Sequence, residues 1–111
     1  MSIIEIDDSP VQGIPNKQQC AAVAQTLKTM AHPQRLMILC QLIDGPKTVT
    51  ELEKLSGATQ SAVSQFLNRM KLENLVACER NSHFVTYKIA DENVKNLIHS
   101  LHKIYCQTEE A

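Results

Sequence analysis

The sequence predicts a mainly α-helical domain with one β-hairpin ahead of its last helix, and three observations support this fold class. A chain of 111 residues has the length of a single domain, and its 43% hydrophobic content suits a globular core. Apolar residues recur at helical spacing through most of the chain, and two neighbouring β-prone runs interrupt that pattern. With aromatic residues at only 4%, we expect a core of mainly aliphatic side chains.

The first half of the chain predicts two helices behind an N-terminal arm. Residues 1–15 contain prolines and glycine with little periodicity, so we interpret them as a flexible arm. Helices are predicted over 16–31 and 33–43, with His32 and Pro33 at the junction. Proline suits the first turn of a helix, whereas the residue before proline avoids helical backbone angles.

Two further helices are predicted in quick succession. Thr48, followed three residues later by Glu51, forms a capping-box pattern that starts a short helix ending near Gly57. Thr59 can cap the next helix, predicted over 60–75, whose apolar residues recur on one face. The two helices are joined by the short segment LSGAT, which leaves little room between them.

A hairpin and a last helix complete the predicted domain. The runs 76–80 and 83–89 read as two strands joined by Asn81 and Ser82, and an apolar stripe predicts a helix over 92–107. Two short helices followed by such a hairpin indicate a winged helix-turn-helix with four helices, a wing and a C-terminal helix. The predicted organisation is an arm at 1–15, a domain at 16–107 and a short tail at 108–111.

The predicted helix over 60–75 has the composition of a DNA-reading helix. Its outward positions carry short hydrogen-bonding side chains that can approach base edges, and no acidic residue occurs between positions 54 and 72. The alternative is an ordinary polar surface helix beside a plain exposed turn. The candidate DNA-contacting residues are Thr59, Gln60, Ser61, Ser64, Gln65, Asn68 and Arg69 in the helix, and Arg80, Asn81, Ser82 and His83 in the hairpin.

Charge and symmetry extend this interpretation to a partner. The formal net charge is −1, but five of the twelve acidic residues lie near the two ends, so the interior is basic enough for phosphate contacts. A near-palindromic duplex is read by two copies of such a module. The expected dimer surface, which could equally be intramolecular core, comprises Leu27, Leu97, Ile98, Leu101, Ile104 and Tyr105.

The segments MAHPQRLMIL and TVTELEKLSGATQSAVSQFL, together with the hairpin, resemble the ArsR/SmtB family of small dimeric bacterial transcription regulators. The resemblance covers roughly residues 17–106. It implies a winged-helix fold without enzymatic activity, and dimerisation through the first and last helices. Where the family usually has a histidine in the recognition helix, this chain has Phe66.

Many members of the resembled family respond to metals, but few metal ligands are present here. The Cys-x-Cys pair of the arsenic- and lead-type sites is missing from the third helix, which reads ELEKLSG. His99 and His102 match the later half of the zinc-type site, whereas the earlier half falls on Thr86 and Lys88. Two histidines leave a tetrahedral site half empty, and Cys106 is the obvious third ligand. A zinc-responsive repressor using these three residues remains the alternative, and no cofactor is expected.

The cysteines point to another branch of the same family. Cys40 in ILCQL and Cys106 in KIYCQ resemble the two thiols of the HlyU/BigR-like branch, whose members sense reactive sulfur or oxidants. The resemblance implies that a disulfide or polysulfide bridge between these thiols releases operator DNA, with a small sulfur or oxidant molecule as inducer. Cys20 and Cys78 have no counterpart in that pattern, and we interpret them as packing residues.

The surroundings of the two thiols predict an order of reaction. Cys106 lies near a helix end with His102 one turn earlier, whereas Cys40 lies in an apolar helix and is expected to resist ionisation. No signal peptide or membrane span is recognisable, so we expect a cytoplasmic protein with reduced thiols. A small thiol-redox enzyme is the remote alternative, because no Cys-x-x-Cys motif occurs.

Overall fold

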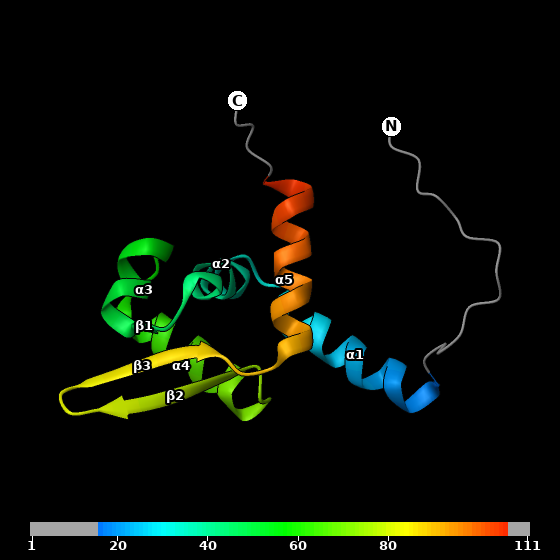
Figure 1. Cartoon of the computed structure of the whole chain (residues 1–111), viewed down its shortest axis with the longest axis horizontal. Helices are drawn as coiled ribbons and strands as arrows, with labels where there is room; N and C mark the ends of the chain where they lie inside the picture. The colour runs from blue at the N-terminus through cyan, green and yellow to red at the C-terminus, as the bar shows by residue number, and fades with distance from the viewer. Residues whose placement is uncertain (1–15, 107–111) are drawn as a thin grey trace.

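The computed structural model describes residues 16–106, which form a helical domain with a three-stranded sheet (Figure 1). The expected arm at 1–15 and tail at 108–111 lie outside the described residues. The mainly α-helical prediction with a hairpin ahead of the last helix is confirmed. The elements are α1 (Lys17–Met30), α2 (Pro33–Gln41), the 3₁₀ turn η1 (Leu42–Asp44), β1 (Lys47–Thr48), α3 (Val49–Ser56), α4 (Gln60–Leu72), β2 (Val76–Asn81), β3 (Phe84–Ile89) and α5 (Glu92–Tyr105).

Local capping chemistry fixes where the helices begin. The Thr48 hydroxyl accepts from the Glu51 backbone N–H at 3.1 Å, and the Glu51 carboxylate accepts from the Thr48 N–H at 2.8 Å. This is the predicted capping box, and it satisfies two backbone donors that the first turn leaves without partners. Thr59 caps α4 in the predicted way, because its hydroxyl accepts from the Ala62 N–H at 3.1 Å.

The second helix is shorter than predicted. Its α-helical part ends at Gln41, and residues Leu42–Asp44 tighten into the 3₁₀ turn η1. The chain then leaves through Gly45, whose φ of 139° is a conformation that side chains other than glycine rarely adopt. A following proline, Pro46, could not have continued the helix. The apolar spacing therefore extended one turn beyond the last α-helical residue.

The sheet has the order β1-β3-β2 and contains the predicted hairpin. Asn81 pairs with Phe84, so the turn consists of Ser82 and His83, one residue later than predicted. Ser82 has a φ of 53°, as the tight turns that join twisted strands require. The short strand β1, which pairs with Tyr87 and its neighbour on β3, was not predicted because two residues carry no recognisable pattern.

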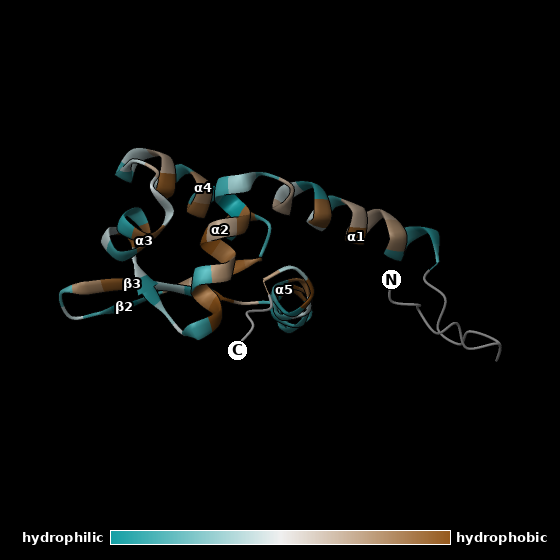
Figure 2. Ribbon diagram, turned by 90° about the horizontal axis from the view of Figure 1, so that it is seen from above, coloured by the Kyte–Doolittle hydropathy of each residue, from teal (hydrophilic) through white to brown (hydrophobic). Residues whose placement is uncertain are grey.

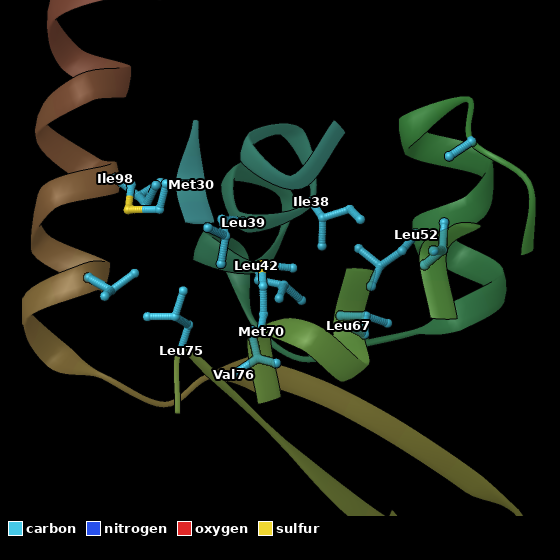
Figure 3. Packing of buried hydrophobic residues seen from close by; sticks show 13 residues of the cluster. Met30, Ile38, Leu39, Leu42, Leu52, Leu67, Met70, Leu75, Val76 and Ile98 are labelled. Carbon is cyan, nitrogen blue, oxygen red and sulfur yellow. The ribbon is translucent and has the colours of Figure 1, made fainter. Parts of the chain in front are cut away.

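A mainly aliphatic core lies between α2, α3, α4, α5 and the start of β2, as the composition predicts (Figure 3). Ile38, Leu39, Leu52 and Leu67 have no exposed surface, and burial of such a side chain contributes about 1.5–3 kcal/mol. Helix α1 extends away from this core, as Figure 2 shows, and only its C-terminal end is buried. Within the described residues, no helix combines the length and the apolar run that a bilayer span requires.

Candidate nucleic-acid interface and thiol pair

A tight connection between α3 and α4 positions the second of these helices. Gly57 ends α3 with a φ of 76°, a left-handed conformation suited to glycine. Directly after it, the Ala58 N–H donates to the Ser56 hydroxyl at 3.2 Å, and Ala58 is buried. The connection anchors the start of α4 against the domain, so the orientation of α4 follows from the packing of α3.

Helix α4 separates a buried face from a polar exposed face. Val63, Leu67 and Met70 are fully buried, so this face holds the helix to the core. Ser64 is half-buried. The candidate DNA-contacting residues that lie exposed at the start of α4 and along it are Thr59, Gln60, Ser61, Gln65, Asn68 and Arg69.

Arg69 differs from the other candidates because it is already paired. Its Nε donates to the Glu73 carboxylate at 2.7 Å, one helical turn away. This hydrogen bond is the largest cause that holds the pKa of Glu73 below its usual value, and a second comes from the Thr29 hydroxyl. Arg69 therefore has to leave or share this partner before it can contact a phosphate.

The hairpin of β2 and β3 extends from the domain and forms the wing (Figure 1), and β2 contacts α4. Arg80, Asn81, Ser82 and His83 are all exposed at its tip. A positive charge at the tip of a projecting hairpin, such as that of Arg80, can contact the DNA phosphates that border a groove. The hairpin candidates thus lie at the tip of the wing, and the helix candidates lie along α4, whose C-cap Glu73 is hydrogen-bonded to Thr29 of α1.

The two thiols of interest come from different helices that contact each other. Cys40 lies near the C-terminal end of α2 and is half-buried, whereas Cys106 ends α5 and is exposed. Burial raises the pKa of the Cys40 thiol, and the charge of Cys106 raises it further. The first effect is the one that its apolar surroundings predict. The second effect means that the two thiols lie within electrostatic reach of each other.

A hollow of about 330 Å³ gives solvent access to Cys40. This size is near the lower end of ligand pockets, which run from roughly 300 to 1,000 Å³, so it suits a small molecule. The hollow is open between the end of α2 and the middle of α5. Its lining residues are Cys40, Gln41, Ile43, Asp44, His99 and His102.

The histidines of α5 do not complete a metal site within one subunit. Among residues 16–106, no group of three His, Cys, Asp or Glu side chains is arranged to hold a metal ion. Thr86 and Lys88, at the positions of the earlier zinc-type ligands, lie on β3 and supply none. His99 and His102 line the hollow beside Cys40 instead.

The remaining cysteines differ from each other. Cys78 is half-buried on β2, and the Lys71 ammonium lies 3.3 Å from its sulfur. Cys20 is exposed on α1, so the structure shows no packing role for it within the described part of one subunit. The reason is that α1 projects from the domain, which its sequence periodicity does not reveal (Figure 2).

The apolar stripe expected to form a dimer surface divides into two sets. Ile98 is fully buried in the subunit and belongs to its core, which corrects its place in the expected interface. Leu97 and Leu101 are half-buried against the same core. The residues that keep large exposed surfaces on α1 and α5 are Leu27, Ile104 and Tyr105, together with Val23, which the sequence analysis did not single out.

Comparison with known proteins identifies the family. Residues 32–77 match the family described as "Bacterial regulatory protein, arsR family". The HTH-type transcriptional regulator YgaV of Escherichia coli is 41% identical over 90 residues, covering 80% of this chain and 88% of that protein. The chain belongs to the ArsR family. It is therefore a transcriptional regulator, and its relatives are regulators rather than enzymes.

Solved structures place this ArsR-family regulator beside two named relatives. HlyU from Vibrio cholerae superimposes with a TM-score of 0.79 at 36% identity, covering 83% of this chain and 100% of that one. The transcriptional repressor BigR from Xylella fastidiosa gives 0.75 at 33% identity, covering 83% and 94%. The winged helix-turn-helix prediction and the resemblance to the HlyU/BigR-like branch are thereby confirmed.

Proposed function

We propose that this ArsR-family regulator acts as a homodimer on a near-palindromic operator, with α4 and the wing of each subunit contacting DNA. The support is the separation of two surfaces. The exposed face of α4 is polar, whereas α1 and α5 carry exposed apolar residues, and α1 extends from the domain on the side opposite the wing (Figure 1). Two subunits joined through the apolar end would present two reading helices to successive major-groove faces.

We further propose that Cys40 and Cys106 form the switch, and that a bridge between them releases the operator. The single observation that carries this proposal is the contact between α2, which carries the half-buried Cys40, and α5, which Cys106 ends. The hollow beside Cys40 supplies a route for a small inducer. A bridge adds a covalent tie between α2 and α5 that the DNA-binding form does not have.

The chemistry needs a thiolate and a resolving thiol. The Cys106 thiolate attacks the outer sulfur of a low-molecular-weight persulfide, forms Cys106 persulfide and releases the donor as a thiol. The Cys40 thiol then attacks the Cys106-bound sulfur, which gives a disulfide and expels hydrosulfide. Because burial raises the pKa of Cys40, Cys40 is the poorer nucleophile near neutral pH and serves as the second thiol.

Intact-mass spectrometry after treatment with a sulfane-sulfur donor, a peroxide or zinc tests this proposal. We expect a bridged subunit, which lacks two hydrogens or has gained whole sulfur atoms, and which a reductant reverses. The product should be lost in Cys40→Ser and in Cys106→Ser, whereas Cys20→Ser is the matched control and should still form it. Retained zinc with unmodified thiols would instead select the alternative that uses His99, His102 and Cys106.

Alkylation rates test the proposed order of the two thiols. We expect a neutral iodoacetamide to label Cys106 in the Cys40→Ser variant faster than it labels Cys40 in the Cys106→Ser variant. The labelling rate of Cys40 should rise only at a higher pH than that of an ordinary thiol, because the raised pKa of Cys40 delays formation of its thiolate. Faster labelling of Cys40 at neutral pH would reverse the order.

A further inference from the structure

A cluster of three side chains joins the start of α2 to the inner side of the reading helix. The rings of His32 and Phe66 lie 4.8 Å apart between centroids, inclined at 54°. The Arg35 guanidinium carbon lies 5.6 Å from the centroid of the same Phe66 ring, within the range of a cation–π contact. We call His32, Arg35 and Phe66 the Phe66 cluster.

Arg35 is fixed in this cluster from a second side. Its Nη1 donates to the backbone carbonyl of Thr29, near the end of α1, at 3.0 Å. Arg35 is half-buried, and its buried Nε finds no hydrogen-bond partner among residues 16–106, so this part of the guanidinium is shielded from water beside the ring of Phe66. Because the Arg35 guanidinium is held by the Thr29 carbonyl as well as by the Phe66 ring, it resists displacement. A shift of α2 therefore carries Arg35 against the ring of Phe66.

The far end of α4 is tied to α1 independently of the cluster. The hydroxyl of Thr29, which is buried, donates to the carboxylate of Glu73 at the C-cap of α4. Glu73 in turn holds Arg69 on the outer face of the helix. The end of α4 is thus anchored to α1, while its middle is held by the Phe66 cluster on α2.

Helix α2 connects this cluster to the thiol site as a rigid rod. Arg35 and Cys40 lie on the same helix, about 7.5 Å apart along its axis at roughly 1.5 Å per residue. Between them, Ile38 and Leu39 are fully buried in the core (Figure 3). Because close-packed interiors transmit strain, a pull on Cys40 tilts the helix about these buried residues and displaces its other end.

We infer that Phe66 is a positioning residue that couples the state of the Cys40–Cys106 pair to the orientation of the reading helix. The inference rests on the proposed function, because it needs a bridge that changes DNA affinity. It adds the route: the tilt of α2 reaches α4 through the ring that Arg35 and His32 hold. Phe66 contacts no base in this account and acts through the helix that carries Gln65 and Asn68.

Binding measurements on reduced and bridged protein test the inference. The probe is the tightest duplex that the reduced wild-type protein selects from a random pool, and the readout is the ratio of its affinities for the two forms. In Phe66→Leu, which keeps an apolar side chain but removes the ring, we expect this ratio to shrink by about 2- to 30-fold. Leu55→Ala, which truncates an exposed apolar side chain on α3 outside the Phe66 cluster, is the control and should keep the wild-type ratio.

Two further measurements separate positioning from a loss of folding. Arg35→Met should shrink the ratio in the same direction as Phe66→Leu, with thermal unfolding recorded for both. Reduced Phe66→Leu should also bind duplexes with altered half-site spacing more evenly than wild type does, because its reading helix is less firmly oriented. A general loss of stability would weaken all duplexes alike.

The outcomes of these experiments distinguish failure of the Phe66 coupling route from failure of the proposed Cys40–Cys106 switch. If bridging leaves the affinity of the wild-type protein unchanged, the proposed switch fails and the inference fails with it. If bridging releases DNA equally well from the wild-type protein and from folded Phe66→Leu and Arg35→Met, only the coupling route is overturned. A reduced ratio in both variants together with relaxed spacing in Phe66→Leu supports the route.

Discussion

The reading end and the thiol end of this subunit are built in contrasting ways. On α4 and the wing, exposed polar side chains project from backbone that the core holds firmly through Val63, Leu67 and Met70. At the thiol end, the half-buried Cys40 lines an open hollow to which α5 adds His99 and His102, and the exposed Cys106 ends the same helix α5. The first arrangement suits recognition of a fixed partner, and the second leaves room for chemistry and movement.

The difference teaches where a small modification can have a large effect. A bridge at the thiol end changes one helix contact, yet the helix concerned, α2, is also part of the core that supports α4. Interfaces and packed cores tend to adopt discrete arrangements rather than deform continuously. A coupling of about 1–3 kcal/mol between the two ends would change DNA affinity by roughly 5- to 150-fold.

The largest predicted effect is a loss of stability in the core that supports both the reading end and the thiol end. Ile38→Ala opens a cavity in the core between the Phe66 cluster and Cys40, and should lower the free energy of unfolding by about 2–5 kcal/mol. Chemical denaturation measures the change. Ile38→Val, which deletes one methylene, should cost about 0.5–1.5 kcal/mol. Equal stability of Ile38→Ala and wild type would show that α2 is not the support that the two ends share.

The next effect tests the apolar end on which the dimer proposal depends. Ile104 is 67% exposed on α5, and Ile104→Lys should weaken self-association by about 2 kcal/mol or more if it lies near the centre of the interface. Analytical ultracentrifugation gives the dissociation constant. Asn96→Lys adds the same charge at an exposed polar position of α5 and should leave the dimer intact. A dimer unaffected by Ile104→Lys would move the interface elsewhere.

A smaller effect separates base reading from phosphate binding at the reading end. Gln65→Ala should cost about 1–3 kcal/mol on the selected duplex and much less on unrelated DNA. Arg80→Ala should weaken all duplexes alike and reduce the salt slope by about one unit. Fluorescence anisotropy over a series of salt concentrations measures both. An unchanged salt slope for Arg80→Ala would remove the wing from the DNA contact.

The smallest effect concerns the anchor between α1 and α4. The pKa of Glu73 is lowered in the folded protein, chiefly by the hydrogen bond from Arg69. The stabilisation is therefore present above the unfolded pKa of glutamate and is lost as the pH falls through the lower folded value. Glu73→Gln should lower the thermal stability at neutral pH, where the ionised carboxylate is paired, and its difference from wild type should shrink as the pH falls, which flattens the acid limb. An acid limb identical to that of wild type would show that the pair contributes no measurable stability.

Local chemistry explains why much of this fold could be predicted from the sequence. The cap at Thr48, the cap at Thr59 and the stop at Gly57 each depend on residues within a few positions of one another. The hairpin followed from two short runs and a turn, although the turn fell one residue later, at Ser82 and His83. Such features need no knowledge of distant contacts.

The errors and omissions at the candidate surfaces involve contacts between distant segments. An apolar stripe cannot say which of its residues turn inward, so the sequence leaves Ile98 open between dimer surface and core, and the structure buries it completely. The Phe66 cluster joins α2 to α4, and neither Arg35 nor His32 carries a local signal for that contact. The pairing of Cys40 with Cys106 is a prediction that rests on family resemblance, because the two thiols lie far apart in the sequence.

Peptide mapping of the oxidised protein tests the central proposal most directly. After treatment with a sulfane-sulfur donor and proteolysis without reductant, mass spectrometry should find the peptide of Cys40 joined to the peptide of Cys106 by two or more sulfur atoms. Mixing light and ¹⁵N-labelled protein before treatment should show that both peptides come from one subunit. Links between two copies of Cys106, or modified thiols that never join, would contradict the account.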